Sequence, residues 1–422
     1  MKFIKIDTRK CISERYKKMM KVKKYNPIRI YVIFLIGYLI QISYLPEEYP
    51  IMKIVFFALY GMGYILGFIQ LLSQSWSKHA KKCAVVMMAI ALMVFIFNGN
   101  IGMEARFVIL NLVWLLLCLR DVDFERLILI DLKIRVIFTA SLFLLCKIGL
   151  LTNVVVVRDY SRERFAWGYG HPNTAGSVLF LIALYLMYVR RKKLNYIDIV
   201  IQCILALITY RVFNSKTSLA GIAMVVLYSV FCIISRLLLR RKKEHTVKVL
   251  RRVIFFAPVL IMILMFTLSA LYNPSSRTMQ ILNKLLTSRL EQGGKILDYY
   301  NPSLFGNNIV RLSWNDALEA GINTAVVGSD VLFIYIYTTF GIASLIMYVF
   351  ILVKNLKYSI KQNFCLTYCM VIMLAVSCVE NQYVNVGSNI FLVCFSCYIY
   401  GVGYIRRAGH NYKLSVQKVI SG

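Results

Sequence analysis

Cationic side chains in one polar segment of this sequence are the groups best suited to chemistry. The segment reads Arg-Glu-Arg-Phe-Ala-Trp-Gly-Tyr-Gly-His-Pro-Asn and contains Arg162, Arg164, Trp167, Tyr169, His171 and Asn173. Guanidinium groups suit phosphate because their planar fork donates two parallel hydrogen bonds. The Gly-His-Pro-Asn end predicts a turn into a helix, whose free N–H groups favour an anion. The same residues also fit an ordinary loop that ends in a helix cap.

Three further segments carry groups of the same kind. The short run from Arg211 to Lys216 fits either a phosphate-binding turn or a polar turn between two helices. A longer segment holds Arg289, then Arg311 and Trp314. Asp330 stands at the mouth of an apolar run, where an ionisable residue is a functional candidate by default, although it also fits an interfacial anchor.

Composition indicates that membrane-spanning helices position these groups. The chain has 422 residues, of which 59% are hydrophobic and 16% are charged, and its mean hydropathy is +0.67. A soluble domain of this length would not need so much apolar surface. The net charge of +31 sits in short runs between apolar segments, which fits membrane topology better than a nucleic-acid partner. We therefore predict an all-α, polytopic integral membrane protein that binds no nucleic acid.

The apolar runs predict about twelve transmembrane helices. The expected spans are 30–45, 51–72, 83–98, 105–119, 136–152, 173–189, 196–212, 217–236, 253–272, 330–353, 364–379 and 390–405. Residues 121–135 alternatively form an interfacial amphipathic helix. We expect one transmembrane domain over 30–405, a basic cytoplasmic segment over 1–29 and a cytoplasmic tail over 406–422.

The distribution of basic residues predicts the orientation. If the N-terminus is cytoplasmic, every basic run between spans falls on the cytoplasmic side, as the positive-inside rule requires. Both termini are then cytoplasmic, and residues 273–328 form a large extracytoplasmic loop. Its apolar residues between Met279 and Leu290 follow a helical stripe, so we expect the loop to be partly helical. Topology does not account for the cations on this outer side, so they are either solvated or bind an anionic ligand.

Taken in order, these motifs resemble the bacterial O-antigen ligase and Wzy-type polysaccharide polymerase superfamily. The similarity covers about residues 160–345. It consists of an outer-loop arginine before a His-Pro-Asn-x-x-Gly helix start, a Ser-Lys-Thr turn two spans later, a Ser-Arg followed by Pro-x-x-Phe-Gly, and an aspartate before a span with Phe-Gly. Two departures favour a polymerase over a ligase. Lys216 stands where many relatives carry arginine, and Asp330 stands where ligases tend to carry histidine.

The resemblance implies a GT-C-like fold and a glycosyltransferase that uses a polyprenyl-pyrophosphate-linked oligosaccharide as donor. It implies catalytic roles for Arg164, His171, Arg289 and Asp330, with His171 or Asp330 as the base. We expect pyrophosphate binding by Arg162, Arg211, Lys216 and Arg311. We expect sugar binding by Trp167, Tyr169, Asn173 and Trp314. No cofactor or metal is expected. The expected partners are membrane lipid, a flippase and a chain-length-regulating co-polymerase, in a bacterial cell membrane.

Two rival functions remain. A ligase of the same superfamily would differ in its acceptor. A flippase or other transporter would differ in class, and transporters often show internal repeats and helices broken at mid-membrane. The sequence shows no convincing repeat, and its charges are expected at the outer mouth of the bundle, so we favour the enzyme.

Overall fold

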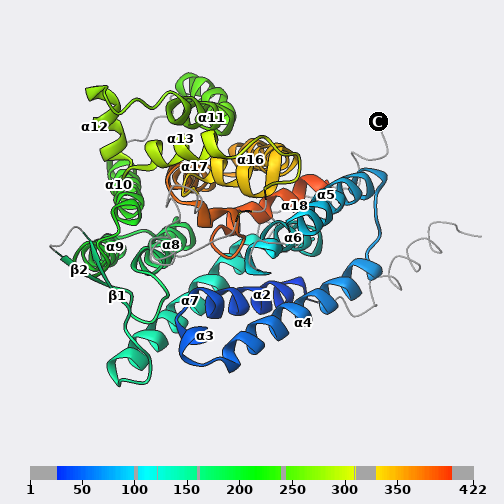
Figure 1. Cartoon of the computed structure of the whole chain (residues 1–422), viewed down its shortest axis with the longest axis horizontal. Helices are drawn as coiled ribbons and strands as arrows, with labels where there is room; N and C mark the ends of the chain where they lie inside the picture. Colours follow the sequence, from blue (N-terminus) through cyan, green and yellow to red (C-terminus); the bar gives the residue numbers. More distant parts are fainter. Residues whose placement is uncertain are drawn as a thin grey trace, which may run out of the picture.

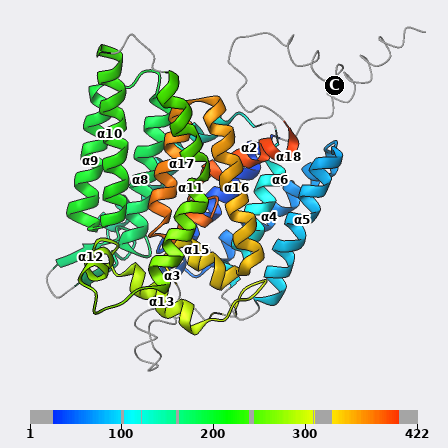
Figure 2. The same ribbon diagram turned by 90° about the horizontal axis from the view of Figure 1, so that it is seen from above.

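The computed structural model describes residues 26–98, 103–120, 122–158, 162–238, 244–307, 309 and 329–401. Within these residues the chain is all-α apart from one two-stranded hairpin. Its long helices stand side by side as a bundle (Figures 1 and 2). Most of the expected N-terminal segment and the whole expected C-terminal tail lie outside the described residues.

The first half of the chain forms helices around a hairpin. The elements are α2 (Pro27–Ile42), α3 (Leu45–Glu48), α4 (Ile51–Ser73), α5 (Lys78–Phe97), α6 (Met103–Cys118), α7 (Phe124–Lys147), β1 (Val155–Arg158), β2 (Arg162–Phe165) and α8 (Pro172–Arg190). The hairpin is antiparallel and pairs Val156 with Arg164. It leads into α8, which begins with proline, a residue whose fixed φ suits a first helical turn.

The second half contains several irregular helices. The elements are α9 (Tyr196–Ile208), the π-helix η1 (Thr209–Phe213), α10 (Lys216–Leu238), α11 (Glu244–Ala270), α12 (Arg277–Leu285), α13 (Arg289–Tyr299), α15 (Leu332–Tyr335), the π-helix η3 (Ile336–Phe340), α16 (Gly341–Gln362), α17 (Phe364–Ser377), the 3₁₀ helices η4 (Asn381–Val384) and η5 (Ile390–Cys394), and α18 (Phe395–Tyr400). Helices α12 and α13 confirm that the long loop 273–328 is partly helical.

The described residues include six helices long and apolar enough to cross a membrane. They are Ile51–Ser73, Lys78–Phe97, Pro172–Arg190, Tyr196–Phe213, Lys216–Ser235 and Leu332–Gln362. Large apolar side chains point outward from them, such as Ile65 on α4, Val85 on α5 and Leu207 on α9. Such surfaces suit contact with lipid. The helices therefore make this a multi-pass membrane protein. Shorter apolar helices over 27–42, 105–118, 254–270, 364–377 and 390–400 accompany the six.

Helix α7 corrects one sequence prediction. The helix expected over 136–152 runs from Phe124 to Lys147 instead, so residues 124–135 continue into it without a break. The alternative of an interfacial position for residues 121–135 stays a prediction. Asp131 and Arg135 are fully buried and form an ion pair one helical turn apart. A buried pair of this kind lets a charged stretch enter the bundle, since each charge is compensated there.

The two ends of the bundle differ in chemistry. Helix α8 starts beside the hairpin and ends at Arg190, while α16 starts next to the long loop and ends near Lys361. The basic runs at 190–193 and 354–361 therefore lie at the end opposite to the hairpin. Helices α3, α12 and α13 gather together at the other end (Figure 2). We call that second end the loop end.

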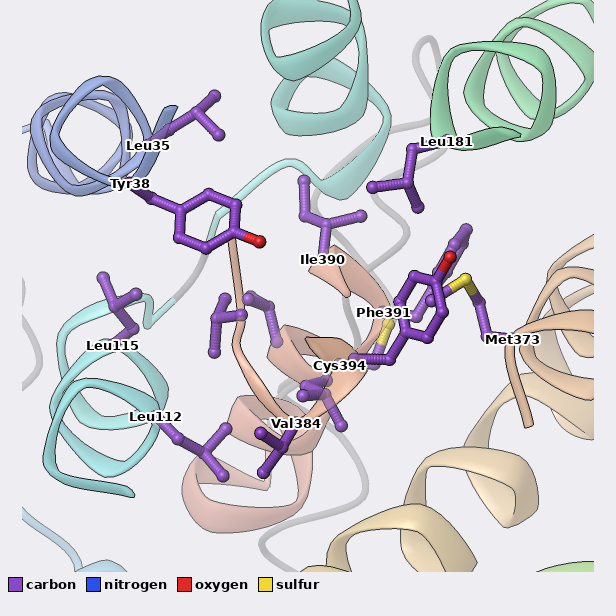
Figure 3. Close-up of a cluster of buried hydrophobic side chains, with 14 of the residues drawn as sticks. Leu35, Tyr38, Leu112, Leu115, Leu181, Met373, Val384, Ile390, Phe391 and Cys394 are labelled. Carbon is purple, nitrogen blue, oxygen red and sulfur yellow. The ribbon is translucent and has the colours of Figure 1, made fainter. Parts of the chain in front are cut away.

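The C-terminal segment 378–394 runs through the centre of the bundle. Figure 3 shows Ile390, Phe391 and Cys394 surrounded by side chains of α2, α6, α8 and α17. Phe391 and Cys394 are buried, and the segment changes between 3₁₀ helix and extended backbone instead of continuing α17. The helical structure is thus interrupted directly after α17, and an irregular segment leads from there into the centre of the bundle. We call this interruption the break after α17.

Candidate functional site

Arg164 joins three elements at the loop end. It comes from β2 and is buried. Its Nε donates to the carbonyl of Phe213, the last residue of η1, at 2.9 Å. Its guanidinium also donates to Oδ1 of Asn173 in the first turn of α8. The predicted catalytic arginine and the predicted sugar-binding asparagine are therefore brought together, and their contact fixes the hairpin against α8 and η1.

His171 is the N-cap of α8. Its Nδ1 accepts a hydrogen bond from the backbone N–H of Asn173 at 3.1 Å. This is the helix-cap interpretation that the sequence left open. A ring nitrogen that accepts this bond cannot at the same time take a proton from a substrate, so the geometry weakens the role of His171 as a base.

Arg289 and Asp330 form an ion pair at the loop end. Arg289 is the first residue of α13, and Asp330 precedes α15. The Arg289 side chain is 17% exposed, and its Nε is buried without a hydrogen-bond partner among the described residues. A buried donor without a partner is unfavourable unless a ligand or water satisfies it. The pair therefore joins two predicted catalytic residues and leaves one arginine donor unused.

Glu380 is the residue that the sequence reasoning missed. It lies between α17 and η4, outside the membrane-spanning helices, and is 8% exposed. The side chain of Thr217, in the first turn of α10, is close enough to its carboxylate to lower its pKa. Burial and the nearby charge of Asp330 raise the pKa of Glu380 to about 7, while Arg289, Thr217 and Arg164 act in the opposite direction. We call Arg164, Arg289, Asp330, Thr217 and Glu380 the acid–arginine cluster.

The break after α17 holds Glu380 in this cluster. The side-chain amide of Asn381 donates to the carbonyl of Ser329 at 2.8 Å and reaches Oδ1 of Asp330 at 3.5 Å. The amide of Gln382 donates to the hydroxyl of Ser177 on α8 at 2.6 Å. One signal for Glu380 is present in the sequence, because it is the last acidic residue and stands alone among apolar segments. Nothing local to it, however, indicates which cations it meets.

Two predicted motifs pack against each other beside the cluster. The Pro-Ser-Leu-Phe-Gly run at 302–306 meets the start of α16, since the N–H of Ile342 donates to the carbonyl of Ser303 at 2.9 Å. Gly306 and Gly341 both adopt positive φ, at 104° and 84°. A β-carbon on Gly341 would lie 2.4 Å from the backbone nitrogen of Gly306. Both positions therefore require glycine.

Of the remaining predicted pyrophosphate ligands, the structure describes the side chains of Arg211 and Lys216. Arg211 is exposed on η1, with its guanidinium carbon 5.9 Å from the centre of the Tyr210 ring. Lys216 is exposed at the start of α10 and lines a separate cavity together with residues of α12. Arg311 lies outside the described residues, and so does the side chain of Arg162.

The two predicted sugar-binding aromatic residues that the structure describes pack against different neighbours. Tyr169 is 1% exposed and hydrogen-bonds Thr139 at 2.8 Å, so it is a packing residue in this structure. Trp167 packs on Phe143, with 4.7 Å between ring centres, and Lys147 lies over its ring. Trp314 lies outside the described residues.

The bundle centre holds a second charged group. The guanidinium of Arg135 donates to Asp131 and to the carbonyl of Gly387, and the hydroxyl of Tyr31 donates to Asp131. This contradicts the expectation that charges collect at the outer mouth. An ion pair beside a broken helix is a transporter-like feature. The position of the charged residues therefore no longer favours an enzyme over a transporter.

No protein-family model matches this chain, and no curated protein and no solved structure matches it. Among the described residues, no three His, Cys, Asp or Glu side chains are grouped as metal ligands would be. The function must therefore be argued from the acid–arginine cluster.

Proposed function

We propose that this protein is a glycosyltransferase that polymerises lipid-linked saccharide repeat units. It would transfer a growing glycan from polyprenyl pyrophosphate to a sugar hydroxyl of another lipid-linked unit, at the outer face of a bacterial cell membrane. The proposal includes about twelve spans, a GT-C-like fold and cytoplasmic termini. The position of the basic runs opposite to the loop end supports this orientation.

The acid–arginine cluster is the observation that carries the proposal. It combines a buried carboxylate with two arginines at one end of a membrane protein. Glycosyl transfer from a pyrophosphate requires both kinds of group. Negative charge develops on the departing pyrophosphate, and the acceptor hydroxyl must lose a proton.

Arg289 is suited to the departing pyrophosphate. Its buried Nε has no partner among the described residues, and a phosphate oxygen would satisfy it. Cations fixed before the reaction stabilise the leaving group more in the transition state than in the ground state. The charge of Arg164 acts on the same cluster. Arg164 contacts the neutral side chain of Asn173, whereas Arg289 is paired with the acidic side chain of Asp330. Binding of substrate would therefore exchange the Arg289–Asp330 ion pair for an arginine–phosphate pair.

Glu380 is suited to accept the proton. The acceptor oxygen forms a bond to the anomeric carbon, the bond from that carbon to the pyrophosphate oxygen breaks, and the hydroxyl proton passes to the Glu380 carboxylate. Its pKa of about 7 places it close to the operating range of a general base. In this proposal Glu380 takes the role that the sequence offered to His171 or Asp330, since His171 caps a helix, and Glu380 is 8% exposed whereas the Asp330 side chain is 36% exposed.

A transporter is the second candidate, and the central ion pair with the broken segment favours it. In that case Asp131, Arg135 and the backbone at Gly387 would form part of a pathway through the bundle. A ligase of the same superfamily would use the same cluster with another acceptor.

The test separates these functions in a strain that lacks the gene. Its lipid-linked oligosaccharides are extracted and assigned to a leaflet and a length. Single repeat units on the outer leaflet would support the polymerase. Units confined to the inner leaflet would establish transport instead, and long polymer still attached to its lipid carrier would establish a ligase.

A further inference from the structure

A polar cavity lies beside the acid–arginine cluster. It has a volume of about 350 Å³ and is formed by the start of α10, Tyr272 between α11 and α12, and α12 with its following turn. Its walls include Lys216, Tyr272, Gln280, Lys284, Thr287 and Ser288. The volume is in the range of small-ligand sites, which run from about 300 to about 1,000 Å³. The side chains are mostly polar or cationic, so the cavity suits a polar anion.

The positive charges of the two lysines in the cavity have no carboxylate partner among the described residues. Neither Lys216 nor Lys284 forms an ion pair within the described part of the chain. The nearby Glu291 is already bound to Lys295 at 2.7 Å. The hydroxyls of Thr287 and Ser288 likewise make no hydrogen bond to the described residues. Two ammonium groups and two free hydroxyls in one cavity are donors that phosphate oxygens accept well.

The cavity adjoins the acid–arginine cluster on two sides. Lys216 precedes Thr217, whose side chain is close enough to Glu380 to act on its pKa. Ser288 precedes Arg289, which pairs with Asp330. The cavity and the cluster thus share their supporting backbone but present different cations. Two anionic groups bound in these two places would lie on either side of that backbone.

We propose that the cavity binds the pyrophosphate of a second lipid-linked saccharide, the acceptor, while the arginines of the cluster hold the departing pyrophosphate of the donor. This inference rests on the proposed polymerase, in which both substrates carry a pyrophosphate. It moves Lys216 from the donor site to the acceptor site and adds Lys284 as its partner. A second pyrophosphate site distinguishes polymerisation from transfer to an acceptor that lacks pyrophosphate.

The test uses purified full-length protein and inorganic pyrophosphate in a calorimetric titration. We expect two binding events for the natural protein. The double variant Lys216→Gln/Lys284→Gln should lose one of them, with affinity weakened on the order of tenfold or more, because two charge-assisted contacts are removed. Arg289→Gln should lose the other. The matched control Lys295→Gln removes one charge from α13 outside the cavity and should keep both events.

Three results would overturn the inference. The double variant binds as the natural protein does, or the Lys295→Gln control weakens binding equally, or phosphatidylglycerol at equal concentration displaces pyrophosphate from the cavity. The last result would make a phospholipid headgroup the ligand. If the double variant does not fold, Lys284→Gln alone gives the same comparison, since its side chain is exposed on α12.

A second measurement separates this inference from the proposed function. In a polymerisation assay, the double variant should raise KM for the acceptor unit at least tenfold and leave kcat within about twofold. An unchanged KM would overturn the acceptor assignment while polymerisation stands. A natural protein that forms no polymer yet shows both pyrophosphate events would instead remove the polymerase and, with it, the acceptor assignment.

Discussion

Replacing Glu380 by glutamine removes the buried carboxylate of the acid–arginine cluster and keeps a side chain of nearly the same size. Asn381 and Gln382 keep their hydrogen bonds to Ser329 and Ser177, so the break after α17 should persist. A general base contributes about 10²-fold to about 10⁴-fold to a rate. We therefore expect Glu380→Gln to lower kcat by that factor at a normal protein level.

The pH dependence of the reaction rate of the natural protein gives a second, independent test of Glu380 as the base. Burial raises the pKa of Glu380 from its ordinary value of 4.5 to about 7. A base with this pKa is deprotonated in about one tenth of molecules at about pH 6 and in about nine tenths at about pH 8. The rate should therefore rise about tenfold over this interval. A carboxylate with the ordinary pKa would be ionised throughout and would give a flat profile.

The stability of the folded protein should fall as pH rises, whereas the reaction rate should rise. A raised pKa means that the folded protein keeps a proton that the unfolded chain releases. The stabilisation is complete below the ordinary value of 4.5 and is lost as pH rises through about 7. The free energy of unfolding should fall by up to about 3 kcal/mol across this interval. Glu380→Gln should abolish this slope.

The assay measures polymer formation from purified lipid-linked units at several pH values, with thermal unfolding of the same samples. Glu380→Asp serves as the matched variant, because it keeps the carboxylate and should retain part of the activity with a shifted profile. Equal activity of Glu380→Gln and the natural protein, or a flat profile between about pH 6 and about pH 8, would refute the role of Glu380 as the base.

Four further substitutions test the cluster and its support. Arg289→Ala should abolish surface glycan on a gel at a normal protein level, whereas Arg164→Ala should also lower the protein level on a blot, because this arginine joins three elements; unchanged glycan in both would contradict the cluster. Asp131→Ala leaves its arginine partner buried and unpaired, so we expect a loss of about 3–5 kcal/mol, visible as a lower Tm. Gly341→Ala should lower Tm more than Gly149→Ala, since both have positive φ but a β-carbon finds open space only at Gly149; equal Tm values would argue against the close approach at 306.

The long helices were the part of the fold that the sequence predicted best. The span expected over 51–72 is the helix Ile51–Ser73, and the span expected over 173–189 is Pro172–Arg190. In both, a continuous apolar run is bounded by proline or by a charged residue, so that hydropathy and helix-end signals agree. The start of helix α7 was expected too late in the chain because hydropathy treats Asp131 and Arg135 as solvent-facing groups. Their mutual pairing inside the bundle cannot be read from either residue alone.

The candidate site was predicted in its two arginines and in Asp330, but not in Glu380. Arg289 and Asp330 were both identified, and they meet although 40 positions separate them, which only the fold can decide. His171 and Tyr169 carried the right residue types for function, yet one caps a helix and the other fills the core. Glu380 had no motif around it. Its importance comes from Thr217, Arg289 and Arg164, which reach it from distant parts of the chain.

The central ion pair and the acid–arginine cluster are linked by the broken segment between them. A break in an apolar bundle frees backbone carbonyls, which must find donors because water is scarce there. Arg135 supplies one donor to Gly387, Tyr348 donates to the carbonyl of Tyr383 at 3.0 Å, and Asn355 donates to the carbonyl of Phe391 at 3.2 Å. These contacts stabilise an irregular backbone where a continued helix would otherwise form.

Without the break, residues after α17 would continue as a regular helix, and Glu380 would be carried around its axis with the following side chains. With the break, Asn381 turns back to Ser329 and Glu380 remains at Thr217. The buried charges at the centre therefore have a role in an enzyme as well as in a transporter, because they hold the backbone that presents the candidate base. Loss of the ion pair in an enzyme should reduce activity and stability together, whereas Glu380→Gln should reduce activity alone.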